Sequence, residues 1–191
     1  MSGFEFFFSF YGLILGLAIA ELLSGFANIA RIGRLRAIGW GTLLLGIEVA
    51  YEILIFWLAA WHNYRDVVPS VRTLAVPFLS GAVYYIAAGI VFPRAEDQIA
   101  DVDGYFMQHK SKVAICLLLI WAVGMIVEFP HTTAAFDAGR YAYLFGYYLP
   151  FNLSLLAGNL ILIFSPSRRL SIAALLVMIG WFLYVTVVNG Y

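Results

Sequence analysis

Two glutamates, Glu48 and Glu52, lie four residues apart inside one continuous apolar stretch of the chain. Residues at this spacing share a face of a helix, so like charges there repel each other. A carboxylate in an apolar surrounding needs a proton, water or a bound cation. The pair therefore predicts a site that exchanges protons or binds a small cation, and the neighbouring Tyr51 is expected to line the same path.

A third glutamate, Glu21, lies in the preceding apolar stretch, and neither stretch contains a lysine or arginine that could form a salt bridge within the membrane. A charged side chain at mid-membrane costs ~2.5 to 3.5 kcal/mol on insertion scales, so it usually faces a bundle interior or a water-filled path. We expect Glu21 to act as a relay on the cytoplasmic side of the other two glutamates.

Two asparagines, Asn152 and Asn159, are seven residues apart on one face of a later apolar stretch. If each residue adds ~1.5 Å of helix rise, the depths of the two asparagines in the membrane are interspersed with those of the three glutamates. The expected path is thus enclosed by the first, second and fifth helices, with the asparagines as neutral hydrogen-bonding wall groups. The alternative is that these polar groups only form hydrogen bonds between helices. Each such contact would stabilise the bundle by ~0.6 kcal/mol.

The stretch around Pro130 predicts a helix end, because proline disrupts a helix interior. Glu128 and His131 flank this proline and are expected at the outer mouth of the path. The chain has three histidines and one cysteine, Cys116. A zinc site needs three or four convergent ligands, so neither a metal nor another cofactor is predicted.

Small residues recur at intervals of four in the first apolar stretch, at Gly12, Gly16, Ala20 and Ser24. Such a stripe lets another helix approach closely. It supports a second hypothesis, in which the chain is a non-catalytic membrane subunit or effector that binds a lipid, a protein partner or a second copy of itself.

An enzyme is the third hypothesis, because Glu48 and Glu52 could serve as an acid and a base. The sequence contains no Ser-His-Asp order, phosphate-binding glycine loop or HExxH motif to support it. Net charge is zero, so nucleic acid is not an expected partner.

The elements that position these residues are membrane-spanning helices. The chain is 63% hydrophobic and 12% charged, with a mean hydropathy of +0.91. A bilayer core of ~30 Å requires ~20 apolar residues in a helix. We predict an all-α, multi-pass helix bundle in an inner or plasma membrane, forming a single transmembrane domain over residues 1–191 with six spans near residues 4–29, 37–61, 72–92, 113–129, 141–164 and 170–188.

The basic residues predict how this bundle is oriented. One side of the membrane receives eight of them: Arg31, Arg34, Arg36, Arg94, Lys110, Lys112, Arg168 and Arg169. The other side receives Arg65, Arg72 and Arg140. The positive-inside rule therefore places both termini outside the cytoplasm. The polar stretch near residues 94–110 is expected to form a short amphipathic helix on the cytoplasmic side.

Overall fold

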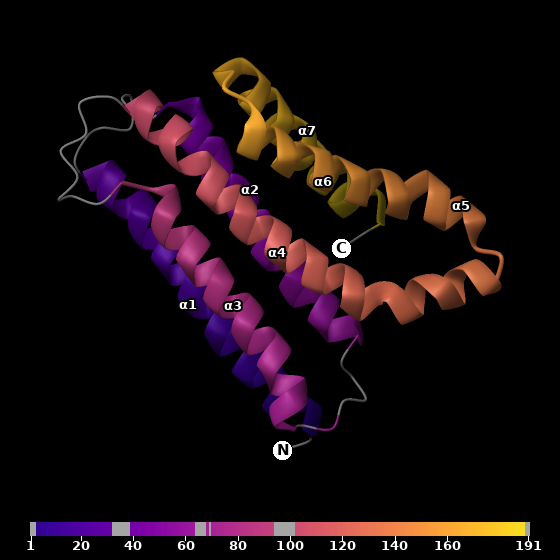
Figure 1. Cartoon of the computed structure of the whole chain (residues 1–191). Helices are drawn as coiled ribbons and strands as arrows, with labels where there is room; N and C mark the ends of the chain where they lie inside the picture. Colours follow the sequence, from indigo (N-terminus) through magenta and orange to yellow (C-terminus); the bar gives the residue numbers. More distant parts are fainter. Residues whose placement is uncertain (1–2, 32–38, 64–67, 69, 94–101, 190–191) are drawn as a thin grey trace.

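The chain forms a bundle of long helices in which successive helices run in opposite directions (Figure 1). This computed structural model describes residues 3–31, 39–63, 68, 70–93 and 102–189. No strand occurs in these ranges, so the predicted all-α class is confirmed. The elements are α1 (Gly3–Arg31), α2 (Trp40–Asn63), α3 (Val71–Val91), α4 (Val102–Asp137), α5 (Tyr141–Tyr143), a π-helical turn η2 (Leu144–Tyr148), α6 (Leu149–Phe164) and α7 (Arg168–Asn189).

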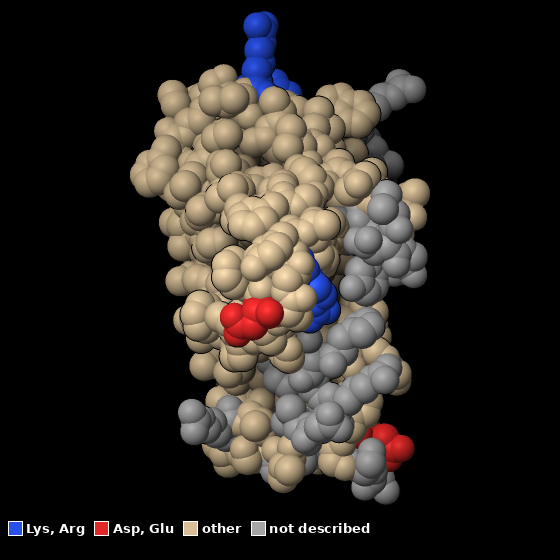
Figure 2. Space-filling view, turned by 90° about the vertical axis from the view of Figure 1, so that its right-hand side faces the viewer, with Lys and Arg blue, Asp and Glu red and all other residues tan. Residues whose placement is uncertain are grey.

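Within the described ranges, five helical segments are long and apolar enough to cross a membrane: Gly3–Arg31, Trp40–Trp61, Thr73–Val91, Gly104–Asp137 and Tyr141–Phe164. They overlap the first five predicted spans, and α7, with 22 residues, covers the sixth. Large apolar side chains such as Leu13, Ile126 and Val187 point outward, as expected for contact with lipid. The face in Figure 2 carries few charged side chains among the described residues. The fold is that of a membrane helix bundle, whereas its orientation stays a prediction.

The described part of the polar stretch that precedes the fourth span is continuous with α4. Residues 94–101 of the expected cytoplasmic helix lie outside the described residues, and residues 102–110 are the first turns of α4. Phe106 is buried there, and the hydroxyl of Tyr105 donates to the main-chain oxygen of Ile90 on α3. The apolar spacing continues from Phe106 to Val113 and Leu117 without a helix breaker, which explains the continuous helix.

The expected helix end at Pro130 is also wrong, because α4 continues to Asp137. Proline removes one backbone donor and crowds the preceding turn, which bends a helix without necessarily ending it. Figure 1 shows α4 changing direction in its C-terminal part. The hydroxyl of Thr133 lies within hydrogen-bonding distance of the carbonyls of Phe129 and Pro130, and Gly139, with φ of 69°, follows the helix end.

Helix α2 occupies the centre of the bundle, where it contacts α1, α3, α4 and α7. Its inward residues Leu45, Val49 and Ile53 are fully buried. Close packing around this helix depends on glycine. The ring of Phe92, just after α3, lies against Gly25 of α1 and Gly46 of α2, where a side chain on either glycine would collide with it.

The small-residue stripe of α1 faces outward rather than into the bundle. Gly16, Ala20 and Ser24 are exposed, and nothing lies within 4 Å of a Cβ placed on Gly16. Gly12, in contrast to Gly16, lies near another helix, with its Cβ position 3.7 Å from the ring of Trp57 on α2. Within the chain, α1 instead packs through larger side chains such as Tyr11, Leu15 and Leu22.

Candidate functional site

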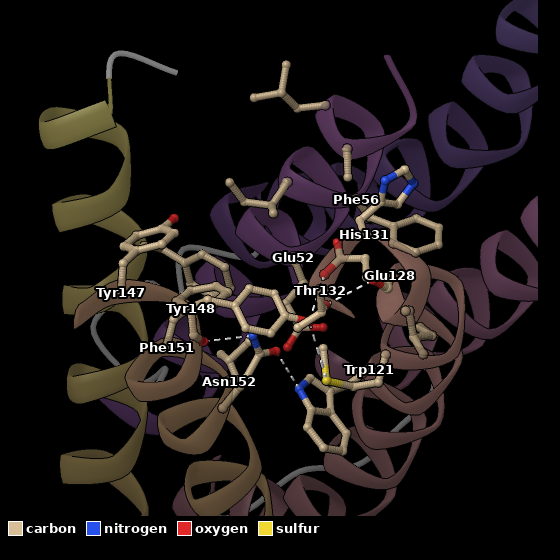
Figure 3. Close-up of a pocket in the computed structure, with 18 of the residues that line it drawn as sticks. Glu52, Phe56, Trp121, Glu128, His131, Thr132, Tyr147, Tyr148, Phe151 and Asn152 are labelled. Atoms are coloured by element: carbon tan, nitrogen blue, oxygen red, sulfur yellow. Dashed lines mark hydrogen bonds between the residues drawn. The ribbon is translucent and has the colours of Figure 1, made fainter. Parts of the chain in front are cut away.

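A cavity of about 450 Å³ lies between α2, α4, η2, α6 and α7, with Tyr84 contributed by α3. Its lining includes four of the residues predicted from the sequence: Glu52, Glu128, His131 and Asn152. Figure 3 shows Glu52 and Glu128 between two groups of aromatic rings. The lining also includes Arg140, an exposed residue in the connection after α4, so the cavity extends toward that end of the bundle.

Helix α2 supplies the acidic wall of the cavity. Glu52, Ile55, Phe56 and Ala59 line it together because they are three or four residues apart on one helix face. Glu52 is only 8% exposed. One turn toward the start of α2, Glu48 is 0% exposed, and both of its carboxylate oxygens are buried with no hydrogen-bond partner in the described part of the chain.

Tyr84 of α3 connects the two glutamates electrostatically. This buried phenol interacts with the carboxyl groups of Glu52 and Glu48 and with the phenol of Tyr11 on α1. Its hydroxyl donates to the main-chain oxygen of Glu52 at 3.4 Å, and the Tyr11 hydroxyl donates to that of Phe56 at 3.0 Å. These two hydrogen bonds join α3 and α1 to the main chain of α2 at Glu52 and Phe56.

A second acidic group lies on α4. The hydroxyl of Tyr148 donates to Oε2 of Glu128 at 3.2 Å, and the hydroxyl of Thr132 lies 3.3 Å from that of Tyr148. The His131 ring interacts electrostatically with the same carboxylate. All three partners line the cavity, so the predicted pair Glu128 and His131 and the central Glu52 belong to one space.

The amide of Asn152 is held from two sides. The indole N–H of Trp121 donates to its Oδ1 at 3.0 Å, and its own Nδ2 donates to the main-chain oxygen of Tyr148 at 2.9 Å. Asn152 thus fixes Trp121 at the cavity wall.

The π-helical turn η2 determines which side chains reach the cavity. The lining residues of this segment form two rows. Tyr143, Tyr147 and Phe151 are four positions apart, as are Leu144, Tyr148 and Asn152, and Leu155 follows Asn152 by three positions. In a regular α-helix of 3.6 residues per turn, a spacing of four drifts by about 40° per step. The wider π turn, with its i to i+5 hydrogen bonds, opposes that drift and keeps both rows on the cavity side.

Three predicted path residues besides Glu48 do not line the cavity. Glu21 packs against α3, where its Oε1 lies 3.5 Å from the Cβ position of Gly89. Tyr51 stacks on Phe182 of α7, with ring centroids 5.7 Å apart. Asn159 is buried in α6, and its Oδ1 has no hydrogen-bond partner among the described residues. The first helix therefore contributes no lining residue, contrary to the expected enclosure by the first, second and fifth helices.

Several important residues were not singled out from the sequence. Tyr84 and Trp121 both lie in the middle of an apolar span, away from the interfacial positions that such rings usually occupy. A polar N–H or O–H at that depth needs a partner, and this could have marked them. Arg140 was considered only as a loop charge.

No group of three or more metal-ligating side chains occurs in the described ranges. No protein-family model matches this sequence, and no curated protein or solved structure is significantly similar to the chain.

Proposed function

We propose that this chain transports protons or small cations across an inner or plasma membrane, with Glu48 and Glu52 as the central exchange site. The observation that carries the proposal is the complete burial of Glu48, whose carboxylate oxygens lack hydrogen-bond partners in the described residues. An ionised carboxylate in that state is strongly unfavourable, so the group must hold a proton or a cation. Such a group can release what it holds when its surroundings change.

Access from one side is supported by the cavity. Glu52 lines it, and the lining continues through Glu128 to the exposed residues His131 and Arg140. No hydrogen bond or ion pair joins Glu48 or Glu52 to a basic side chain in the part of the chain that is described. A proton could therefore pass between the cavity, Glu52 and Glu48 without first breaking a salt bridge.

Continuation toward the other side is supported by two further buried polar groups without partners, the hydroxyl of Thr42 and Oδ1 of Asn159. Helix α2 begins at the end of the bundle where α6 finishes. At ~1.5 Å per residue, Thr42 lies ~3 Å from the start of α2 and Asn159 lies ~8 Å from the end of α6, whereas Glu48 is ~12 Å deep. Both groups thus lie on the far side of Glu48 from the cavity.

Proton flux into vesicles tests the proposal. The protein is reconstituted with a pH-sensitive dye in the lumen, and an imposed pH gradient or membrane potential drives uptake. We expect Glu48→Gln and Glu52→Gln to reduce flux to the level of empty vesicles while folded yield is retained. Asp137→Asn is the matched control, because it also removes one acid but at an exposed position on α4 outside the cavity. Wild-type vesicles in which neither protons nor small cations cross faster than in empty vesicles would refute the proposal.

The alternative function, a membrane subunit that assembles through α1, is favoured by the outward position of the small-residue stripe. Gly16, Ala20 and Ser24 leave a shallow surface that another helix could approach closely. Under this alternative, Gly16→Leu disperses an assembly seen by size-exclusion chromatography, while Glu48→Gln and Glu52→Gln have no effect on it. The two sets of variants separate the two functions.

A further inference from the structure

The cavity is much larger than a proton path requires. Its volume of about 450 Å³ falls within the range of about 300 to 1,000 Å³ that is typical of sites for small organic ligands. The described residues hold no group of three or more His, Cys, Asp or Glu side chains that could bind a bare metal ion. The size and lining of the cavity point to an organic ligand.

Aromatic rings form two walls of this cavity. On one side the ring of Phe56 meets that of Tyr84 edge to face, with centroids 5.5 Å apart. On the other side Phe151 stacks with Tyr147 at 6.2 Å and meets Phe182 edge to face at 5.4 Å. Figure 3 shows Glu52 and Glu128 in the space between Phe56 and the rings of Tyr147 and Phe151.

Aromatic faces and a buried carboxylate together favour a cation. The face of an aromatic ring attracts ammonium and guanidinium groups, most strongly when water is excluded. Glu52, 8% exposed, supplies a carboxyl group that can ionise against a bound cation, at a depth where the low dielectric constant strengthens their attraction. The basic residues of the lining, His131 and Arg140, are exposed, so solvent and salt screen their charge far more effectively.

We propose that the cavity binds a small monovalent organic cation, an ammonium with apolar substituents. Its charged group lies beside Glu52 and Tyr84, and its apolar substituents lie against the two aromatic walls. Glu128, held by Tyr148, provides the second acidic group near the open end. The inference rests on the proposed function, since it names the class of cation that the Glu52 site accepts.

Equilibrium binding to the full chain in lipid nanodiscs tests this proposal. The probe is benzyltrimethylammonium, and the control ligand is neopentylbenzene, its neutral isostere with carbon in place of nitrogen. Titration calorimetry, or the fluorescence of the cavity residue Trp121, follows binding. We expect the cation to bind at least about tenfold more tightly than the isostere, because only the cation gains from the carboxylate and the ring faces. Equal affinity for the two ligands would overturn the proposal without any variant.

Two pairs of variants assign the binding to this cavity. Glu52→Gln should weaken binding of the cation at least about tenfold and leave the isostere unaffected, whereas the surface control Asp137→Asn should change neither. Phe56→Leu should weaken cation binding, whereas Phe129→Leu, which alters an exposed ring on α4 outside the cavity, should not. Undiminished cation binding by Glu52→Gln would contradict the proposed site.

The outcome for transport is measured separately. Cation binding in nanodiscs by a protein that shows no flux in vesicles would support this binding site and refute the proposed transport. Proton flux that requires Glu48 and Glu52, in a protein that does not bind benzyltrimethylammonium, would refute the binding site and support transport.

Discussion

Lys110 and Glu48 are both almost completely buried in the helix bundle, yet their surroundings are opposite. Lys110 is 2% exposed, and its Nζ donates to the main-chain oxygens of Leu162 and Ser165 and to Oγ of Ser171, at 3.0, 2.6 and 2.9 Å. All three ammonium protons therefore have acceptors. Glu48 has no hydrogen-bond partner for either oxygen among the described residues.

The helix dipoles increase this contrast. Lys110 meets the C-terminal end of α6, where unpaired carbonyls carry a partial negative charge that stabilises a cation. Glu48 lies eight residues after Trp40, at the start of α2, beyond the first turn in which a helix N-terminus stabilises an anion. Within the described residues, one buried ionisable group thus has all its hydrogen bonds and the other has none. A buried polar group with all its hydrogen bonds formed is suited to stabilising the fold. A buried group without hydrogen-bond partners is suited to exchanging a proton or a cation.

The largest loss of stability is expected when Lys110 is replaced by methionine. The apolar part of the side chain is kept, but the acceptors at Ser165 and Ser171 lose their donor, and we expect a loss of ~2 to 5 kcal/mol. The measurement is the midpoint of thermal unfolding in detergent, followed by loss of the monodisperse peak in size-exclusion chromatography. A midpoint equal to that of the wild type would show that Lys110 does not stabilise the fold.

A smaller loss is expected when Gly46 is replaced by alanine. The new Cβ would lie 2.7 Å from Cζ of Phe92 and 3.1 Å from Cζ of Phe26, so two packed rings must shift. Overpacking of this kind costs ~1 to 3 kcal/mol. The matched control is Gly180→Ala on α7, where nothing lies within 4 Å of the added methyl group.

The Gly46 variant sharpens the comparison because Gly46 lies two residues before Glu48 and therefore on nearly the opposite side of α2. A lower unfolding midpoint for Gly46→Ala than for Gly180→Ala would show that α2 is tightly packed against Phe92 and Phe26 on that side. Equal midpoints would mean that these two rings yield to the added methyl group and that α2 is loosely packed at this level of the bundle.

The fold and the site differ in how far they could be predicted from the sequence. Continuous apolar stretches predicted the helices, because hydrocarbon surroundings require backbone hydrogen bonds within each helix. The same rule could not predict that Lys110 is buried while other basic residues lie in loops. The burial of Lys110 depends on carbonyls at the end of α6, more than fifty positions away. Pairing between distant elements leaves no periodic pattern in the sequence.

The residues of the site were predicted only in part for a similar reason. Glu52, Glu128, His131 and Asn152 attracted attention as polar groups in apolar surroundings, and they line one cavity. Depth alone placed Glu21 with them, but depth does not determine the direction in which a side chain points around its helix. The π turn of η2 depends on an extra residue in one helical turn. Pro150 follows this turn in the chain, but a proline by itself does not specify a π turn.

The smallest change in stability is expected for Glu48→Gln, although this variant should lose all proton flux. Glutamine has nearly the shape of a protonated glutamate, so a Glu48 that holds a proton loses no charged partner on substitution. We expect the free energy of unfolding, judged from the thermal midpoint, to change by less than ~1 kcal/mol. A change of this size is common for tolerated substitutions. Compared with the result for Lys110→Met, such a small change would show that the two buried residues have different roles. A loss as large as that of Lys110→Met would instead mean that ionised Glu48 has a structural partner, because removal of one member of a buried charge pair costs ~3 to 5 kcal/mol.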